Sequence, residues 1–316
     1  MTPPTILIVG ATGNTGFPLT TYLPSLLPRT NTLRHYRILA LTRNQASPSA
    51  QELAKLPGVE TAEHNWTELD DTWLRSQNVK RIFIASHNEP SQFAEEGQFL
   101  GNALRAGVGY VVRISTTAAN VKPDHPAYYP RTHWAIEQML DQPEFEAMKW
   151  TSLQPNIFFN FVLPGAVEVI KEFKKTGKQI PLALMIAEDV PVGLIDPGDV
   201  GILAAHLLAQ DDVAEYNRAR LVLNGPGDVT GAQVAEMVEE RIGAKIEKVT
   251  YRDVGFVERM AEQVPQAKNL IRSVRFAPVT AWEGLCKAET TSKEVLGLAA
   301  PRTTAAQALD ALLAGS

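Results

Sequence analysis

The chain has 316 residues, of which 45% are apolar and 21% charged, and its 30 basic and 35 acidic side chains give a net charge of −5. These values are ordinary for a globular protein and exclude a disordered, collagen-like or coiled-coil chain. The mild acidity argues against a nucleic-acid partner, and the single cysteine, Cys286, excludes an internal disulfide framework and a multi-cysteine zinc site.

The first predicted element is an apolar run at residues 6–9. It is far shorter than a signal-peptide core or a membrane span, and no basic segment precedes it. We therefore expect a cytosolic protein that has no membrane partner.

Short apolar runs rich in β-branched residues recur through the first half of the chain and predict strands buried on both faces of a parallel sheet. These runs occupy residues 6–9, 37–41, 81–85, 110–114 and 150–153. Helical spacing predicts helices between them, at residues 20–27, 67–76, 92–106 and 131–140. The alternation predicts an α/β protein with a doubly wound parallel Rossmann sheet.

The second half of the chain lacks the regular alternation of short apolar runs and helical segments, and it begins with an aromatic stretch after Pro155. Further strands are predicted at residues 221–223 and 245–251, and further helices at residues 199–209, 230–242, 253–263 and 304–313. A length of roughly 150 residues per domain predicts two domains or one enlarged domain. We divide the chain into a Rossmann domain, 1–155, and a smaller α/β substrate-side domain, 156–316, partly interleaved with the first.

A glycine-rich turn with the spacing G-x-x-G-x-x-G directly follows the first predicted strand and opens a helix. Glycine permits a tight turn and close approach of the backbone to a pyrophosphate, and the helix N-terminus offers unpaired N–H groups to that anion. The alternative is a plain strand–helix turn without a ligand. We predict a dinucleotide site whose pyrophosphate contacts come from Gly10, Thr12, Gly13, Asn14, Thr15 and Gly16.

The end of the second strand selects between the two nicotinamide cofactors. It carries Arg43 and no acidic residue, so it offers a partner for a 2′-phosphate rather than for a free ribose hydroxyl. This predicts NADP(H), the alternative being a solvated arginine. Ligands of parallel sheets bind at the carboxyl ends of the strands, and three later residues there are predicted cofactor contacts: Asn65, Ala85 and Ser86. Asn65 has the alternative of capping a turn.

These motifs resemble the NmrA-like branch of the atypical short-chain dehydrogenase/reductase superfamily, with the texture of its fungal members. The glycine turn, Arg43 and residues 115–117 and 153–156 carry the resemblance, and residues 192–201 and 224–231 are similar to later landmarks of that family. The resemblance covers nearly the whole chain. It implies an extended Rossmann fold, bound NADP(H), and either reductase activity or a cofactor-sensing regulatory role.

The usual active site of that superfamily is a serine with Tyr-x-x-x-Lys, in which the lysine lowers the pKa of the tyrosine. Here Ser115 follows the predicted strand at residues 110–114, and Tyr129 and His133 have the spacing with histidine in place of lysine. Pro130 predicts that Tyr129 precedes the helix. The His-x-x-x-Glu pattern formed with Glu137 is similar to the quinone oxidoreductases of the family.

We predict catalytic roles for Ser115, Tyr129 and His133, with His133 also contacting the nicotinamide end of the cofactor. Glu137, one helical turn beyond His133, is expected to orient or charge the imidazole. The alternative is a helix-face ion pair between these two residues that performs no chemistry.

The substrate side is predicted after the strand at residues 150–153, where aromatic residues are dense. Trp134, Phe158 and Phe159 are predicted to line an aromatic pocket, with ordinary core packing as the alternative. Asn156, a polar amide among aromatic residues, is predicted to contact the cofactor. Asp199 precedes a helical run and is predicted to cap it. The sequence shows no metal-ligand spacing and no G-x-S-x-G nucleophile motif.

The prediction is an NADPH-dependent oxidoreductase that reduces a quinone, an enone or a related conjugated carbonyl, with secondary metabolism as one setting. Its partner would be a small aromatic or quinone-like molecule, and the sequence leaves the oligomeric state open. Two alternatives remain: a non-catalytic NADP(H)-sensing regulator, and a non-redox isomerase or cyclase on the same fold. An open aromatic pocket favours the enzyme, and a site filled by side chains favours the regulator.

Overall fold

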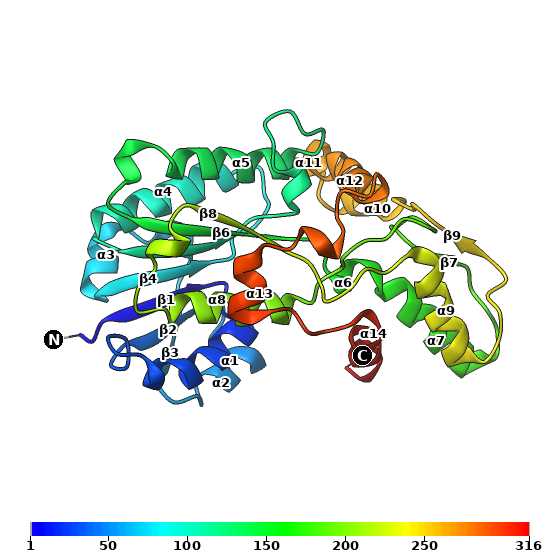
Figure 1. Cartoon of the computed structure of the whole chain (residues 1–316), viewed down its shortest axis with the longest axis horizontal. Coiled ribbons are helices and arrows are strands. Elements are labelled where there is room, and N and C mark those ends of the chain that lie inside the picture. Colours follow the sequence, from blue (N-terminus) through cyan, green and yellow to red (C-terminus); the bar gives the residue numbers. More distant parts are fainter. Residues whose placement is uncertain (1, 316) are drawn as a thin grey trace.

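The computed structural model describes residues 2–315, and its centre is a seven-stranded sheet in the order β3-β2-β1-β4-β5-β6-β8 (Figure 1). Every neighbouring pair in this sheet is parallel. The order reverses between β1 and β4, which is the switch point at which such sheets bind ligands. The strands are β1 (Thr5–Val9), β2 (Arg37–Thr42), β3 (Val59–Glu63), β4 (Val79–Ile84), β5 (Tyr110–Ile114), β6 (Lys149–Pro155) and β8 (Ala219–Leu223).

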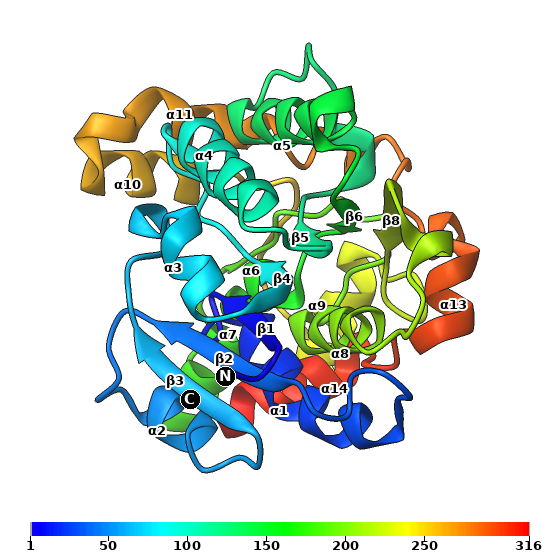
Figure 2. The ribbon, with the colours of Figure 1, turned by 90° about the vertical axis from the view of Figure 1, so that its left-hand side faces the viewer.

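Helices cover both faces of the sheet, so the predicted doubly wound Rossmann architecture is confirmed (Figure 2). One face carries α1 (Gly16–Leu26), α2 (Pro48–Leu53) and α8 (Pro197–Leu208). The other carries α3 (Asp71–Ser76), α4 (Gln92–Arg105) and α5 (Tyr128–Leu140).

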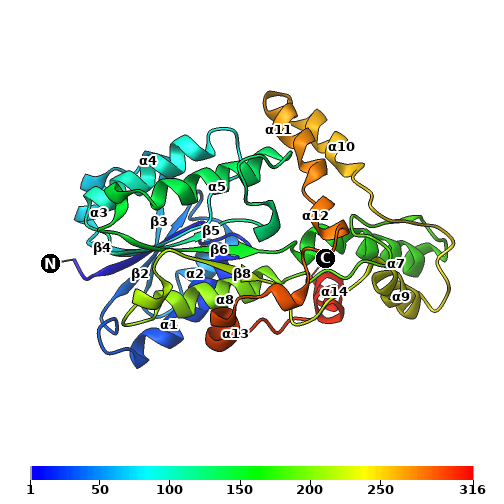
Figure 3. The same ribbon diagram turned by 45° about the horizontal axis from the view of Figure 1, so that its top comes forward.

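A second lobe lies beyond the carboxyl ends of the strands (Figures 1 and 3). Its own core joins α7, α9 and α14 to a two-stranded sheet of β7 and β9. Helices α10 and α11 project to the side of the sheet that carries α4 and α5 (Figure 3). The elements are α6 (Phe159–Val162), α7 (Pro164–Thr176), β7 (Leu182–Ala183), α9 (Gly231–Ile242), β9 (Val249–Thr250), α10 (Phe256–Gln263), α11 (Lys268–Ser273), α12 (Val279–Trp282) and α14 (Ala305–Ala314).

Three elements of the second half of the chain return to the sheet. They are β8, which pairs with β6, α8, and α13 (Lys293–Ala299), whose Val295 belongs to the sheet core. These elements follow residue 155 in the chain and yet pack with the sheet. The domain division at residue 155 therefore remains a prediction.

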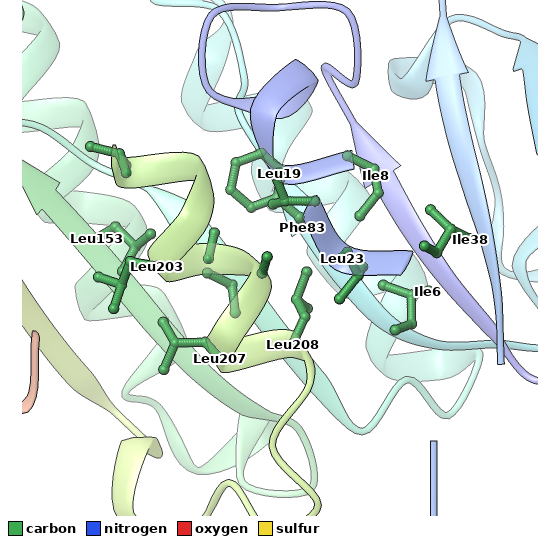
Figure 4. Packing of buried hydrophobic residues seen from close by; sticks show 14 of the residues in the cluster. Ile6, Ile8, Leu19, Leu23, Ile38, Phe83, Leu153, Leu203, Leu207 and Leu208 are labelled. Carbon is green, nitrogen blue, oxygen red and sulfur yellow. The ribbon is translucent and has the colours of Figure 1, made fainter. Parts of the chain in front are cut away.

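The core beneath α1 and α8 is largely apolar, with Arg81 of β4 buried beside the end of α8, where its Nη1 donates to Leu208 O at 2.8 Å. Figure 4 shows leucines of both helices packed on side chains of the sheet. The helices approach closely at Gly201, where a Cβ would lie 2.4 Å from the carbonyl oxygen of Thr15. This contact fixes the start of α1, and with it the glycine turn. The labelled residues are Ile6, Ile8, Leu19, Leu23, Ile38, Phe83, Leu153, Leu203, Leu207 and Leu208.

Two local predictions are wrong. Tyr129 lies inside the first turn of α5 rather than before it, because a proline in the first turn loses only an N–H that has no helical partner. Asp196, not Asp199, caps α8, and its carboxylate accepts the N–H of Gly198 at 2.7 Å. The Asp199 carboxylate instead accepts the N–H groups of Arg302 and Thr303 at 3.0 and 2.9 Å.

Two further searches cover residues 2–315. No helix in this range is long and apolar enough to cross a bilayer. No group of three or more His, Cys, Asp or Glu side chains in the same range is placed to hold a metal ion.

Candidate functional site

The glycine turn between β1 and α1 depends on backbone conformations and approaches that only glycine allows. Gly10 has φ +81°, in the left-handed region, and its carbonyl oxygen accepts the N–H of Gly13 at 3.0 Å. A Cβ on Gly16 would lie 2.1 Å from that same oxygen. The turn therefore brings the start of α1 directly against the end of β1.

The start of α1 has the properties of an anion site. No side chain caps it, and its first turn has no acidic residue. Between Thr2 and Gly315, no acceptor receives the backbone N–H groups of Asn14, Thr15 or Gly16. Gly13 and Asn14 are exposed, so the cradle is open on its outer side. These features fit a pyrophosphate, since helix N-termini of this kind bind phosphates.

The other predicted cofactor contacts lie along the same edge of the sheet. Arg43 directly follows β2, is exposed, and has no ion-pair partner among residues 2–315. The carbonyl oxygen of Ala85 lies 3.0 Å from the position of a Cβ on Gly10, so the end of β4 touches the glycine turn. Asn65 caps a short turn, where its side chain accepts the N–H of Thr67 at 3.3 Å. A cofactor role for each of these residues stays a prediction.

Polar side chains replace apolar ones on one face of the sheet toward the carboxyl ends of β4, β5, β6 and β8. Arg113 pairs in register with Ile84 and Ser152, and Ser152 pairs with Arg220. Side chains two residues apart point to the same face of a strand, so the next row holds Ser86, Ser115 and Gln154. Both rows lie beneath α4 and α5, because Arg113 and Ser86 reach Glu96 of α4.

Arg113 is the centre of this polar layer and is 0% exposed. Its Nε donates to Glu96 Oε1 at 2.8 Å, its Nη1 to Ser152 Oγ at 3.2 Å, and its Nη2 to His133 Nδ1 at 3.0 Å. Ser86 also donates to Glu96, at 2.7 Å. A buried charge requires such partners, since an unpaired one costs several kcal/mol.

Glu137 belongs to the same layer but not to His133. Its carboxylate accepts from Ser152 Oγ at 2.6 Å, from Gln154 Nε2 at 3.2 Å, and from Arg220 Nε at 3.0 Å. The prediction that Glu137 orients or charges His133 is therefore wrong, and the two do not form an ion pair either. The residue that orients the imidazole is Arg113, which comes from the adjacent strand rather than from the same helix.

The contacts of His133 determine its protonation. A guanidinium only donates hydrogen bonds, so Nδ1 carries no proton and the single ring proton is on Nε2. That nitrogen donates to Asn88 Oδ1 at 3.1 Å. Burial, and then the Arg113 charge, hold the pKa of His133 well below its usual value. The imidazole is therefore a neutral, fully hydrogen-bonded group that is only 3% exposed.

Ser115 and Tyr129 border the same carboxyl edge. Ser115 is 5% exposed, and within residues 2–315 its Oγ has no hydrogen-bond partner. The Tyr129 ring stands edge-on to His133 with 6.3 Å between centroids. Burial raises the pKa of Tyr129, and the neighbouring Thr116 hydroxyl opposes this only in part. The structure thus brings Tyr129 and His133 into ring contact, and it places Ser115, with an unused hydroxyl, after β5 at the same edge of the sheet.

The three predicted pocket aromatics do not meet, so that prediction is corrected. Trp134 follows His133 on α5 but points away from it and lines an open groove of about 870 Å³ facing α11. Phe159 is buried in the core of the second lobe. Phe158 packs against the sheet core and stacks on Phe161. Consecutive helical residues diverge by about 100°, so Trp134 does not share the direction of His133.

Asn156 also has a different role from the predicted one. Its Nδ2 lies 3.1 Å from Gly193 O, 2.8 Å from Asn224 Oδ1 and 2.9 Å from Cys286 O. Its Oδ1 accepts the N–H of Ile157 at 2.8 Å. The amide joins segments that are far apart in the chain, and no polar atom of it remains for a cofactor.

The sequence reasoning missed Glu96, Arg113 and Asn88. An arginine inside an otherwise apolar, two-sided buried strand was a usable signal, because such a residue needs a buried partner. Nothing in the sequence pairs it with Glu96 or with His133. Asn88 lies in a loop and had no periodic signal.

A profile of the NmrA-like family matches residues 2–281. No curated protein sequence matches the chain significantly. Among solved structures, the chain is similar to the NADPH-dependent quinone oxidoreductase QOR2 of Escherichia coli, complexed with NADPH. The TM-score is 0.72 at 22% identity, covering 97% of this chain and 99% of that one.

Two further solved structures are similar. Triphenylmethane reductase of Citrobacter sp., complexed with NADP(H), has a TM-score of 0.68 at 18% identity, covering 97% of this chain and 99% of that one. NmrA, a negative transcriptional regulator in complex with NADP, has a TM-score of 0.62 at 15% identity, covering 100% and 92%. At these identities the similarity shows the fold. Because the family profile spans most of the sequence, the chain belongs to the NmrA-like family.

Proposed function

We propose that this protein is an NADPH-dependent oxidoreductase whose substrates are quinones, enones or related conjugated carbonyls. The open glycine cradle would hold the pyrophosphate of NADP(H), and Arg43 would pair with the 2′-phosphate. The unpartnered Ser115 hydroxyl is a buried polar group that a bound ligand would satisfy. The solved relatives described above support this cofactor. When bound, NADPH supplies a hydride.

The substrate class follows from the groups that this site offers for moving a proton. His133 occupies the usual lysine position, yet it is neutral, buried and hydrogen-bonded at both nitrogens. Tyr129 keeps its proton, because burial raises its pKa. Neither residue is an activated proton donor. Hydride transfer to a simple ketone forms a high-energy alkoxide unless a positioned group donates a proton as the hydride arrives, whereas a hydroquinone anion or an enolate is far more stable and can take its proton from water afterwards. The neutral His133 is the observation that carries the proposal.

The test compares acceptors at a fixed NADPH concentration. We expect NADPH oxidation with quinones and enones to exceed that with simple ketones and aldehydes at least ten-fold. His133→Ala should strongly reduce the rate, and His206→Ala, which alters a half-buried histidine on α8, should not. Equal rates with ketones would reject the substrate class, and tight NADPH binding without oxidation by any acceptor would reject the enzyme.

The cofactor assignment has its own test. Arg43→Glu should weaken NADPH binding far more than NADH binding, whereas Arg29→Glu, at another exposed arginine, should change neither. Gly13→Val should weaken both cofactors by filling the cradle. An equal loss of NADPH and NADH binding in Arg43→Glu would contradict the 2′-phosphate contact.

A second candidate function is an NADP(H)-binding regulator without turnover. The observation that favours it is the dispersal of Trp134, Phe158 and Phe159, which do not form one aromatic pocket. The similarity to the regulator NmrA supports the same candidate. Such a protein would bind NADPH in the test above and leave every acceptor unreduced.

A further inference from the structure

The loop after β4 carries an exposed asparagine, Asn88, that is joined to the buried polar layer. Asn88 Oδ1 accepts a hydrogen bond from His133 Nε2 at 3.1 Å. Between Thr2 and Gly315, no acceptor receives a hydrogen bond from Asn88 Nδ2. Asn88 is therefore the last member of a hydrogen-bond series that begins at the fully buried Arg113.

The donor and acceptor roles in this hydrogen-bond series are fixed at its buried end. Arg113 can only donate, so it makes His133 Nδ1 an acceptor and leaves the single ring proton on Nε2. That proton needs an acceptor, so Asn88 must turn its oxygen inward and its amide N–H groups outward. The network thereby settles which end of the Asn88 amide is oxygen, which the amide's shape alone does not.

The loop that carries Asn88 is held on both sides. His87 Nε2 lies 2.6 Å from Glu95 Oε2 of α4, and the backbone N–H of Glu89 donates to His87 Nδ1 at 3.2 Å. These contacts restrict the loop at the residues before and after Asn88. A donor that is held in place before binding loses less conformational entropy when a ligand arrives.

We propose that Arg113, His133 and Asn88 form a hydrogen-bond relay of fixed direction, whose outer donor, Asn88 Nδ2, binds a carbonyl-type oxygen of the molecule held at the carboxyl edge of the sheet. This inference rests on the proposed function. The oxygen belongs either to the carbonyl of the acceptor or to the carboxamide of the nicotinamide. Asn88 is the binding residue, and His133 and Arg113 are positioning residues that act through it.

The relay also explains how His133 acts while 3% exposed. Both ring nitrogens have protein partners, so the ring meets a ligand only through Asn88. Removing His133 would then free the Asn88 amide to rotate and present its oxygen outward.

The experiment uses Asn88→Ala and Asn88→Asp, with Glu89→Gln as the matched control. Aspartate accepts the His133 proton as asparagine does, but it offers no outward donor. Glu89→Gln removes a charge from the same loop and leaves the relay intact. We expect both Asn88 variants to raise either the Kd for NADPH or the KM for 1,4-benzoquinone at least ten-fold, and Glu89→Gln to change them less than two-fold. The constant that rises identifies the molecule that supplies the oxygen.

The positioning roles have separate readouts. Nitrogen-15 NMR of the ligand-free protein should find the His133 proton on Nε2, in the wild type and in Asn88→Asp. His133→Phe should raise the same binding constant, Kd or KM, that Asn88→Ala raises. In the Asn88→Ala background it should add little, because each change alone already interrupts the same relay.

Three results would each overturn the relay. The first is a proton on Nδ1 of His133, and the second is full additivity of His133→Phe and Asn88→Ala. The third is a Kd for NADPH and a KM for 1,4-benzoquinone that both stay within two-fold of wild type in the Asn88 variants. If no quinone is reduced at all, the proposed function fails. The ring proton position and the Kd values for NADPH and for the quinone then still decide the relay, since none of them requires turnover.

Discussion

The two faces of the sheet hold the same strands in different ways. Beneath α1 and α8, β5 and β6 present Val112 and Leu153 to an apolar core (Figure 4). Beneath α4 and α5, the residues beside them, Arg113 and Ser152, join a hydrogen-bonded layer. Both faces also hold apolar clusters, and the α8 face buries Arg81, which donates to Leu208 O. Apolar packing is non-directional, whereas buried charges are stable only when each donor meets its acceptor. The polar layer around Arg113 therefore fixes side-chain orientations more strictly than the apolar packing around it.

The largest expected effect comes from removing the centre of the polar layer. Arg113→Met would leave Glu96 buried without its cation, and we expect a loss of about 3–5 kcal/mol in the free energy of unfolding. Urea denaturation measures it. Adding Glu96→Gln should recover part of the loss. A cost below about 1 kcal/mol for the single variant would show that the layer is not a network of mutually dependent charges.

The matching change on the apolar face is Leu203→Ala. Leu203 is fully buried in the core between α8 and the sheet, so the cavity should cost about 2–5 kcal/mol. The same denaturation curves should keep the wild-type pH dependence, because no titrating group is touched. A changed pH dependence would mean that the two faces are coupled through the sheet.

The pH dependence itself distinguishes the faces. Because burial and Arg113 lower the pKa of His133 in the folded state, the unfolded chain binds a proton below pH 6.5 that the folded protein does not. Stability is therefore complete above this pH and falls as the pH is lowered toward the folded-state pKa, by up to about 1.4 kcal/mol per pH unit. Denaturation at pH 7.5 and pH 5.5 should show a smaller loss in His133→Gln than in the wild type. Equal losses would contradict a neutral, buried His133.

The last comparison is between two serines of the polar layer, and Ser115 carries the smallest expected effect. Ser152 donates to Glu137 and accepts from Arg113, so Ser152→Ala should cost about 1–3 kcal/mol. The Ser115 hydroxyl has no partner between Thr2 and Gly315, so Ser115→Ala should leave stability unchanged or raise it by up to about 1 kcal/mol. The same variant should weaken NADPH or quinone binding. A destabilised Ser115→Ala would show that its hydroxyl is already satisfied in the ligand-free protein.

Local patterns predicted the platform of this molecule well. Each apolar run in the first half is a strand of the parallel sheet, and the glycine turn joins β1 to α1 as its spacing requires. The predicted strand at 245–251 is reduced to the two residues of β9, and the helix predicted from 67 begins only at Asp71. These differences lie where the sequence lacks a strong repeat, so the surrounding packing sets the boundary.

Side-chain partnerships could not be predicted in this way. Helical spacing connected His133 to Glu137, whereas the fold connects it to Arg113 on the neighbouring strand and to Asn88 in a loop. Asn156 was correctly identified as an amide that needs partners, but the partners are protein groups from three distant segments.

The sequence by itself determined the strands and helices of the Rossmann sheet, the glycine turn and the arginine at the end of β2, because each can be recognised from a short run of neighbouring residues. The tertiary structure alone decided the state of the site. Only the register of β4, β5 and β6 places Arg113 against His133, and that contact makes the histidine neutral and directs its proton to Asn88. Hydrogen-bond direction is a property of groups in contact, and the contacts that set it here join residues 20 and 45 positions apart in the chain.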